Sequence, residues 1–95
     1  MAAFSDPADI TLFQTALQDQ DVGIRFAAVE AVQRWGREGS TEFLRQAMAD
    51  PWSPLLRVFA AQATLSLGNE EGLPVLFTAL DDRSWMVRAL AARYL

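Results

Sequence analysis

The apolar residues of this chain recur with the spacing of helices. The stretch 40–49 has apolar residues at positions i, i+1, i+4 and i+5, which lie on one face of a helix. Longer helices are expected at about 22–35, 54–67 and 85–95. No segment sustains an alternation of apolar and polar residues, so we expect no strands. The pattern predicts an all-α protein in which short and longer helices follow one another.

The helical pattern occurs in three copies. Each copy begins with two apolar residues, two variable residues, an alanine and another apolar residue, and an aspartate follows two residues later. An apolar residue and an arginine then open a second segment that contains an Ala-Ala pair. The first motif occupies Leu12–Leu17, Phe43–Met48 and Val75–Leu80, the aspartates are Asp19, Asp50 and Asp82, and the arginines are Arg25, Arg57 and Arg88. We place the repeats at about 6–36, 38–68 and 70–95.

Each copy is expected to contain two antiparallel helices joined by a turn at the aspartate. In the first two copies the second helix stops at Gly36 and Gly68, and glycine readily adopts the left-handed conformation that ends a helix. Helix pairs repeated at a short fixed period stack so that each pair contacts only its neighbours. The sequence therefore predicts one domain over residues 1–95, an α-solenoid of about two and a half repeats.

Over nearly its whole length the chain resembles the HEAT-like repeats, in particular the short-period kind first associated with phycobilisome lyases. The resemblance is carried by the first-helix motif, the aspartate turn, the Ile/Leu/Val-Arg pair, the Ala-Ala pair and the closing Trp-Gly or Leu-Gly. It implies an armadillo-like superhelix. It also implies that the repeated aspartates and arginines form a structural ladder between turns and are not catalytic.

The sequence departs from this repeat pattern at two places. The second copy has one extra residue between Asp50 and Arg57, which affects the geometry of its turn. In the third copy the closing glycine would fall at position 99, beyond Leu95. We expect either that the chain is part of a longer array or that another surface covers its open C-terminal end.

Composition excludes several kinds of chemistry. The 95 residues are 52% hydrophobic and 21% charged, with a net charge of −4, which excludes a disordered chain. All eight basic residues are arginine, and histidine, lysine and cysteine are absent. The chain therefore lacks an imidazole base, a thiolate nucleophile, a Schiff-base lysine and the usual zinc ligands.

No catalytic, metal or cofactor site is expected. The acidic pairs Asp19/Asp21, Glu70/Glu71 and Asp81/Asp82 do not match a loop with the ligands that Mg²⁺ or Ca²⁺ require. The charges form no basic stripe, so we expect no nucleic-acid binding. No apolar run is long enough for a membrane span and no signal peptide is evident, so we expect a cytoplasmic location.

The second helices are apolar on two faces. With the arginine of each copy at position zero, positions −1, +3, +6 and +10 are expected to be buried. The opposite face should be polar in a solvent-exposed helix, but here it is mostly apolar. The expected buried residues are Ile24, Ala28, Ala31 and Trp35, then Leu56, Ala60, Ala63 and Leu67.

We interpret the opposite face as a contact strip for a protein partner or a second copy. Its apolar members are Phe26, Val29, Val58 and Leu65, with Glu30 and Gln62 beside them. The alternative is that tight curvature buries these side chains within the array. Trp52 and Trp85 lie in the turns, where each either anchors a partner or packs over its own turn.

The sequence therefore predicts a non-enzymatic module for protein binding or assembly, which presents a concave apolar surface. A chain of this length buries only about 60–65% of its unfolded surface, so we expect stabilisation by neighbours or self-association, through the second-helix face or the open C-terminal end. The family resemblance leaves one alternative, a subunit or fragment of a phycobilin lyase or isomerase that acts on phycobiliproteins.

Overall fold

The described part of the chain is entirely helical. The structure, a computed structural model, describes residues 8–36 and 39–95, and these form six helices and no strand. The helices are α1 (Ala8–Leu17), α2 (Val22–Trp35), α3 (Ser40–Met48), α4 (Pro54–Ser66), α5 (Gly72–Ala79) and α6 (Trp85–Tyr94). The all-α prediction is confirmed, and the predicted second helices agree with α2, α4 and α6 to within a residue at each end.

Local interactions fix where the second helices begin. The Asp21 side chain accepts a hydrogen bond from the Gly23 N–H at the start of α2. The Ser53 hydroxyl accepts one from the Leu56 N–H at the start of α4, where Pro54 occupies the first helical position. Both interactions satisfy backbone donors that the first turn of a helix leaves without a partner.

The two closing glycines behave as the sequence predicts. Gly36 has a φ of 59° and its N–H donates to the Val32 carbonyl, so α2 ends in a left-handed residue. Gly68 has a φ of 87° just after α4. Side chains other than that of glycine rarely tolerate this region, and the chain therefore reverses direction at these two positions.

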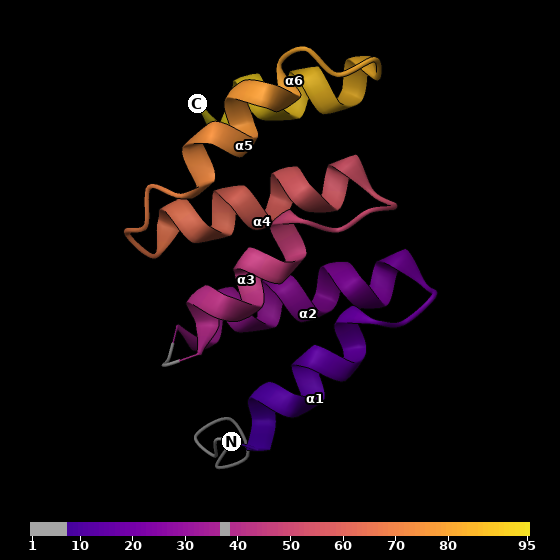
Figure 1. Ribbon diagram of the computed structural model, residues 1–95, viewed down its shortest axis with the longest axis vertical. Coiled ribbons are helices and arrows are strands. Elements are labelled where there is room, and N and C mark those ends of the chain that lie inside the picture. The colour runs from indigo at the N-terminus through magenta and orange to yellow at the C-terminus, as the bar shows by residue number, and fades with distance from the viewer. Residues whose placement is uncertain (1–7, 37–38) are drawn as a thin grey trace.

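The helices are arranged in successive layers along the long axis of the molecule (Figure 1). The chain measures about 40 × 29 × 18 Å along its principal axes. Helix α4 lies at the centre and packs against α2, α3, α5 and α6. The turns at 18–21, 49–53 and 80–84 all lie on one side, at the right in Figure 1, and we call this side the turn edge. None of the helices in residues 8–36 and 39–95 is long and apolar enough to cross a membrane.

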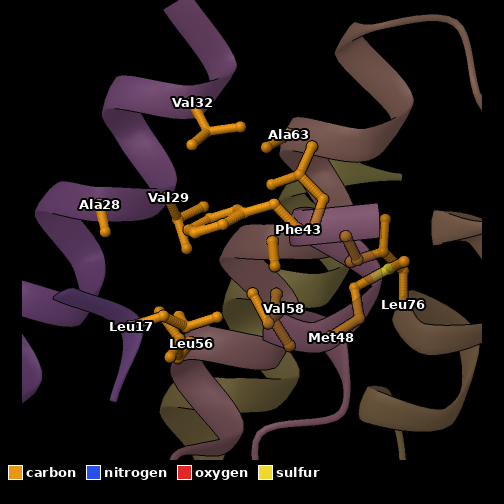
Figure 2. Close-up of a cluster of buried hydrophobic side chains, with 14 of the residues drawn as sticks. Leu17, Ala28, Val29, Val32, Phe43, Met48, Leu56, Val58, Ala63 and Leu76 are labelled. Carbon is orange, nitrogen blue, oxygen red and sulfur yellow. The ribbon is translucent and has the colours of Figure 1, made fainter. Parts of the chain in front are cut away.

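The hydrophobic core runs between the layers. Figure 2 shows Phe43 of α3 beside Val29 of α2, and Leu56 of α4 beside Leu17 of α1. Phe43 also meets the Phe13 ring edge to face at 6.5 Å. Side chains from one copy therefore complete the burial of side chains in the copy before it.

The predicted buried face of the second helices is correct in part. Ala28, Leu56, Ala60 and Ala63 are buried. Ile24 and Leu67 are instead exposed, at 42% and 40%. For Ile24 the reason is its place in the first copy. Its equivalent Leu56 is buried against the preceding copy, whereas Ile24 has no such layer beneath it among the described residues.

A close approach between backbones joins the second and third copies. Gly72, the first residue of α5, is buried against α4. A methyl group at this position would overlap the Ala61 carbonyl oxygen and lie 3.1 Å from Leu65 Cγ. The carbonyl belongs to the middle of a helix and cannot move aside. The absence of a side chain at Gly72 therefore sets the distance between α4 and α5.

We expect Gly72→Ala to lower the free energy of unfolding by about 3 kcal/mol, because the overlap with Ala61 forces the two helices apart. Urea unfolding followed by far-UV circular dichroism measures the change. Gly23→Ala is the control, since a methyl group there meets only the Asp21 carboxylate, at 3.1 Å. Its stability should stay within about 1 kcal/mol of the parent. Equal losses in the two variants would show that the α4–α5 distance is not set by Gly72.

Candidate functional site

The repeated aspartates organise the turn edge. In each copy the carboxylate accepts a hydrogen bond from the backbone N–H two residues further on, which is the geometry of an Asx turn. The bonded pairs are Asp19 with Asp21 N–H at 2.8 Å, Asp50 with Trp52 N–H at 3.1 Å and Asp82 with Ser84 N–H at 2.9 Å. These carboxylates therefore hold the backbone of their own turns.

The repeated arginines close the same turns. In each copy the guanidinium Nη1 donates to the backbone carbonyl of the aspartate. The distances are 2.7 Å for Arg25 to Asp19, 2.6 Å for Arg57 to Asp50 and 2.8 Å for Arg88 to Asp82. Each second helix is thus tied to the end of the first helix of its own copy. We call this pair of interactions, the Asx turn and the arginine bond, the Asp–Arg clasp.

The extra residue in the second copy leaves the clasp intact. Asp50 accepts a second backbone hydrogen bond, from the Ser53 N–H at 2.7 Å. This bond folds the additional residue into the turn, and Arg57 still reaches the Asp50 carbonyl. The insertion therefore changes the length of the turn but not the connection that the turn makes.

The ladder between turns implied by the family resemblance is present at one step among the described residues. Arg25 Nε lies 3.8 Å from Asp50 Oδ1, and both side chains are buried. Trp52 covers the same guanidinium, with its ring centroid 6.0 Å from Arg25 Cζ. Arg57 is half-buried and Arg88 is exposed. The burial of the three arginines thus falls along the chain, and the most buried, Arg25, is the one that Asp50 and Trp52 of the following turn cover.

The predicted contact strip needs a correction. Val29 and Val58 are fully buried in the core, so they offer no surface to a partner. The strip prediction treated each second helix as packing on one side only. Helix α2 contacts α3 and α4 as well as α1, and α4 contacts four other helices, so the outward positions of the helical wheel face the next copy. These additional helix neighbours bury this part of the strip within the molecule.

The other strip residues remain partly accessible. Phe26 is half-buried and packs against Phe59, with ring centroids 5.3 Å apart and planes at 41°. Gln62 and Leu65 are half-buried, and Glu30 is exposed and pairs with Arg34 on its own helix. Phe26 borders an open, apolar hollow.

That hollow lies between the N-terminal parts of α2 and α4 and one face of α6. Its volume is about 380 Å³, and we call it the second-helix hollow. Trp85 and Met86 at its border are 69% and 47% exposed. The residues that line it are Phe26, Leu55, Trp85, Met86, Ala89, Leu90 and Arg93. It is therefore an apolar surface with one positive charge among its described lining residues.

Phe26 and Trp85 are predicted contact residues, and Arg93 lies at the same helical-wheel position as the predicted Glu30, whereas Leu55 and Met86 were not predicted. Relative to the arginine, Leu55 and Met86 occupy position −2 and Arg93 position +5. Phe26 and Ala89 lie at position +1. Position −2 is three residues before it and position +5 is four residues after it, so all of these residues share one helical face. Extension of the strip by one turn toward the N-terminus of each helix would have found Leu55 and Met86.

Trp52 borders a different, more polar hollow on the turn edge. It is 72% exposed, and the hollow of about 430 Å³ is also lined by Gln18, Asp19, Gln20 and Arg25. One face of the Trp52 ring covers Arg25, so this tryptophan packs over a turn, as one of its two interpretations stated. Trp85, by contrast, borders the apolar second-helix hollow.

A second connection between copies is an exposed ion pair. Arg45 of α3 donates from Nη2 to Glu71 Oε1 at 2.8 Å and from Nε to Glu71 Oε2 at 3.1 Å. These hydrogen bonds, and then the positive charge, hold the pKa of Glu71 below its ordinary value. The same hydrogen bonds raise the pKa of Arg45. The pair links the second copy to the residues just before α5.

Comparisons with known proteins give no further constraint. No protein-family model matches the chain, and no curated protein shows a significant similarity to it.

We expect Arg25→Ala to lower the free energy of unfolding by about 3 kcal/mol, and Arg88→Ala by about 1 kcal/mol. Both variants lose the bond to the aspartate carbonyl. Arg25→Ala also leaves the buried Asp50 carboxylate without its nearest cation and removes the surface on which Trp52 packs. Urea titration of both variants tests this difference. Similar losses would contradict the view that the covering turn determines the contribution of each clasp.

We expect Glu71→Gln to reduce stability at neutral pH, with a loss that disappears in acid. The pKa of Glu71 is lower in the folded chain than in the unfolded chain. The stabilisation by the Arg45–Glu71 pair is therefore complete above the unfolded pKa. It is lost as the pH falls through the folded pKa. Thermal unfolding midpoints measured from pH 7 downward test this dependence. The control is Glu70→Gln, which removes the neighbouring carboxylate. A loss independent of pH, or one equal to that of the control, would argue against the Arg45 pair.

Proposed function

We propose that the chain is a HEAT-like α-solenoid module that binds a protein partner and has no enzymatic role. The order of helix contacts supports this arrangement, since first and second helices of a copy pack together and α4 packs against the second helices on both sides. The Asp–Arg clasp, repeated three times, supports equivalence of the copies. Repeat arrays of this kind commonly use an extended surface rather than a closed pocket to bind other proteins.

The second-helix hollow is the observation on which the binding role depends. It places Trp85, Met86 and Phe26 around a volume of about 380 Å³ on the second-helix side of the module. Exposed tryptophan and methionine beside an apolar depression are typical of the centres of protein interfaces, where burial of a few large side chains supplies most of the binding free energy. We therefore assign the anchor position of the partner to this hollow.

The lining also indicates what the partner presents. An apolar side chain fits between Trp85 and Leu55, since both walls are hydrophobic. Arg93 is the charged group at this surface, and its guanidinium favours a carboxylate placed beside the apolar anchor. The proposed ligand is therefore a protein segment in which an aspartate or glutamate lies close to a large apolar residue.

We expect peptides selected from a random displayed library on the parent chain to share this pairing of a large apolar residue with an acidic one. Trp85→Ala should weaken their binding about tenfold or more, as truncation of an interface centre does. Fluorescence anisotropy of the labelled peptides measures the affinities. Arg93→Gln should weaken binding less and remove the preference for the acidic residue.

Trp52→Ala is the matched control, because Trp52 is equally exposed but lies outside the second-helix hollow. Its peptide affinities should stay within about twofold of the parent. Unchanged affinities in Trp85→Ala, or losses confined to Trp52→Ala, would place the binding surface elsewhere. Circular dichroism spectra of both variants verify that the helices persist.

A further inference from the structure

Both ends of the structure expose residues whose equivalents are buried inside it. At the N-terminal end, Leu12 is 67% exposed, whereas its equivalent in the second copy, Phe43, is fully buried against Phe13 of the first copy. Ile24 is likewise exposed, whereas its equivalent Leu56 is buried beside Leu17 (Figure 2). The first copy thus presents the surface that the second copy uses to pack on its predecessor.

The C-terminal end presents the opposite half of that interface. Ala92 is exposed, whereas its equivalents Ala61 and Val29 are buried, and Ala61 lies under Gly72 of the next copy. Phe77 is 57% exposed at the position where the second copy has Arg45, which bonds to Glu71 of the next copy. In the second copy, Ala61 and Arg45 at these positions contact the third copy.

The charges at the two ends match in the same way. Arg88 is exposed at the C-terminal end, whereas its equivalent Arg25 is buried with the Asp50 carboxylate 3.8 Å from its Nε. Asp19, the equivalent of Asp50, is exposed at the N-terminal end. One end therefore carries the cation of the internal contact, and the other carries the anion.

We infer that two copies of this chain associate head to tail, with the first repeat of one copy packed on the third repeat of the other. The internal interface is the template: Leu12 and Ile24 of one chain cover the Phe77 and Ala92 surface of the next, and Asp19 approaches Arg88. Single exposed apolar residues are ordinary in proteins. The occupant follows from the positions of the exposed residues: Leu12 and Ile24 at one end and Ala92 at the other have equivalents that are buried between copies, and Arg88 and Asp19 are equivalent to the Arg25 and Asp50 of the one internal ion pair.

This inference goes beyond the proposed function and uses different surfaces, since Leu12, Phe77 and Ala92 do not line the second-helix hollow. The contact is heterologous, because one chain contributes its N-terminal face and the other its C-terminal face. A dimer therefore still has one free N-terminal face and one free C-terminal face. Association of this type continues with rising concentration and does not stop at a dimer. Repeat arrays that remain monomeric carry polar faces at their ends.

The test is a mixing experiment with two variants that each block one face. Leu12→Glu places a charge on the N-terminal face, and Ala92→Glu places the same charge on the C-terminal face. Both residues are exposed, so folding should be retained. Gln46→Glu, at an exposed position of the second copy, is the matched control. Sedimentation velocity and light scattering from micromolar to millimolar concentration measure the mass.

For the parent and for Gln46→Glu, the mean mass should rise continuously above the 10.5 kDa of one chain. Each blocked variant alone should remain at 10.5 kDa, and their equimolar mixture should reach twice that mass and no more. The mixture forms this dimer because one intact face of each kind remains. If either variant loses its helical spectrum, Ile24→Glu or Phe77→Glu replaces it on the same face.

Three results would overturn the inference. The first is a parent chain that stays at 10.5 kDa over the whole concentration range. The second is a mixture of blocked variants that shows no dimer. The third is a blocked variant that dimerises alone, which would indicate a symmetric contact between like faces. Peptide binding by Leu12→Glu and Ala92→Glu is measured in parallel, so that failure of the self-association and failure of the second-helix hollow are distinguished.

Discussion

The hydrogen bond from each repeated arginine to the aspartate carbonyl is the interaction on which the arrangement of this molecule depends. It fixes the second helix of a copy against the end of the first, with bonds of 2.6–2.8 Å in all three turns. Since the helices are short, their relative orientation has few other local determinants. Because all three turns have the same bond, the copies can pack in the same way, and this similarity allows the core to continue from one copy to the next.

The sequence predicted the helices well because their boundaries depend on neighbouring residues. Asp21, Ser53, Pro54 and the two closing glycines act within one helical turn of their own positions, so periodicity and capping suffice. The Asp–Arg clasp in the turns was predicted only in outline. The family resemblance implied a ladder between turns, whereas most of the observed bonds lie within a copy, because Arg57 and Arg88 reach backbone carbonyls of their own turns.

The surface was harder to predict, since exposure depends on how many neighbours a helix has. Val58 and Ile24 show this in opposite directions. Val58 lies on the outward side of its helical wheel but is buried because α4 has neighbours on all sides. Ile24 lies on the inward side but is exposed because the described structure has no layer below it. A helical wheel gives one direction of packing, whereas α4 contacts four other helices, and the predicted strip did not extend to Leu55 and Met86 at the hollow.

The decreasing burial of Arg25, Arg57 and Arg88 also bears on how the molecule opens. Stability in stacked arrays is a sum of terms within copies and terms between adjacent copies. The third copy has a neighbour on one side only among the described residues, and its clasp is exposed to water. We therefore expect the backbone amides of α5 and α6 to exchange with solvent sooner than those of the central helix α4. A partner that covers this end would slow that exchange without any change in the helices themselves.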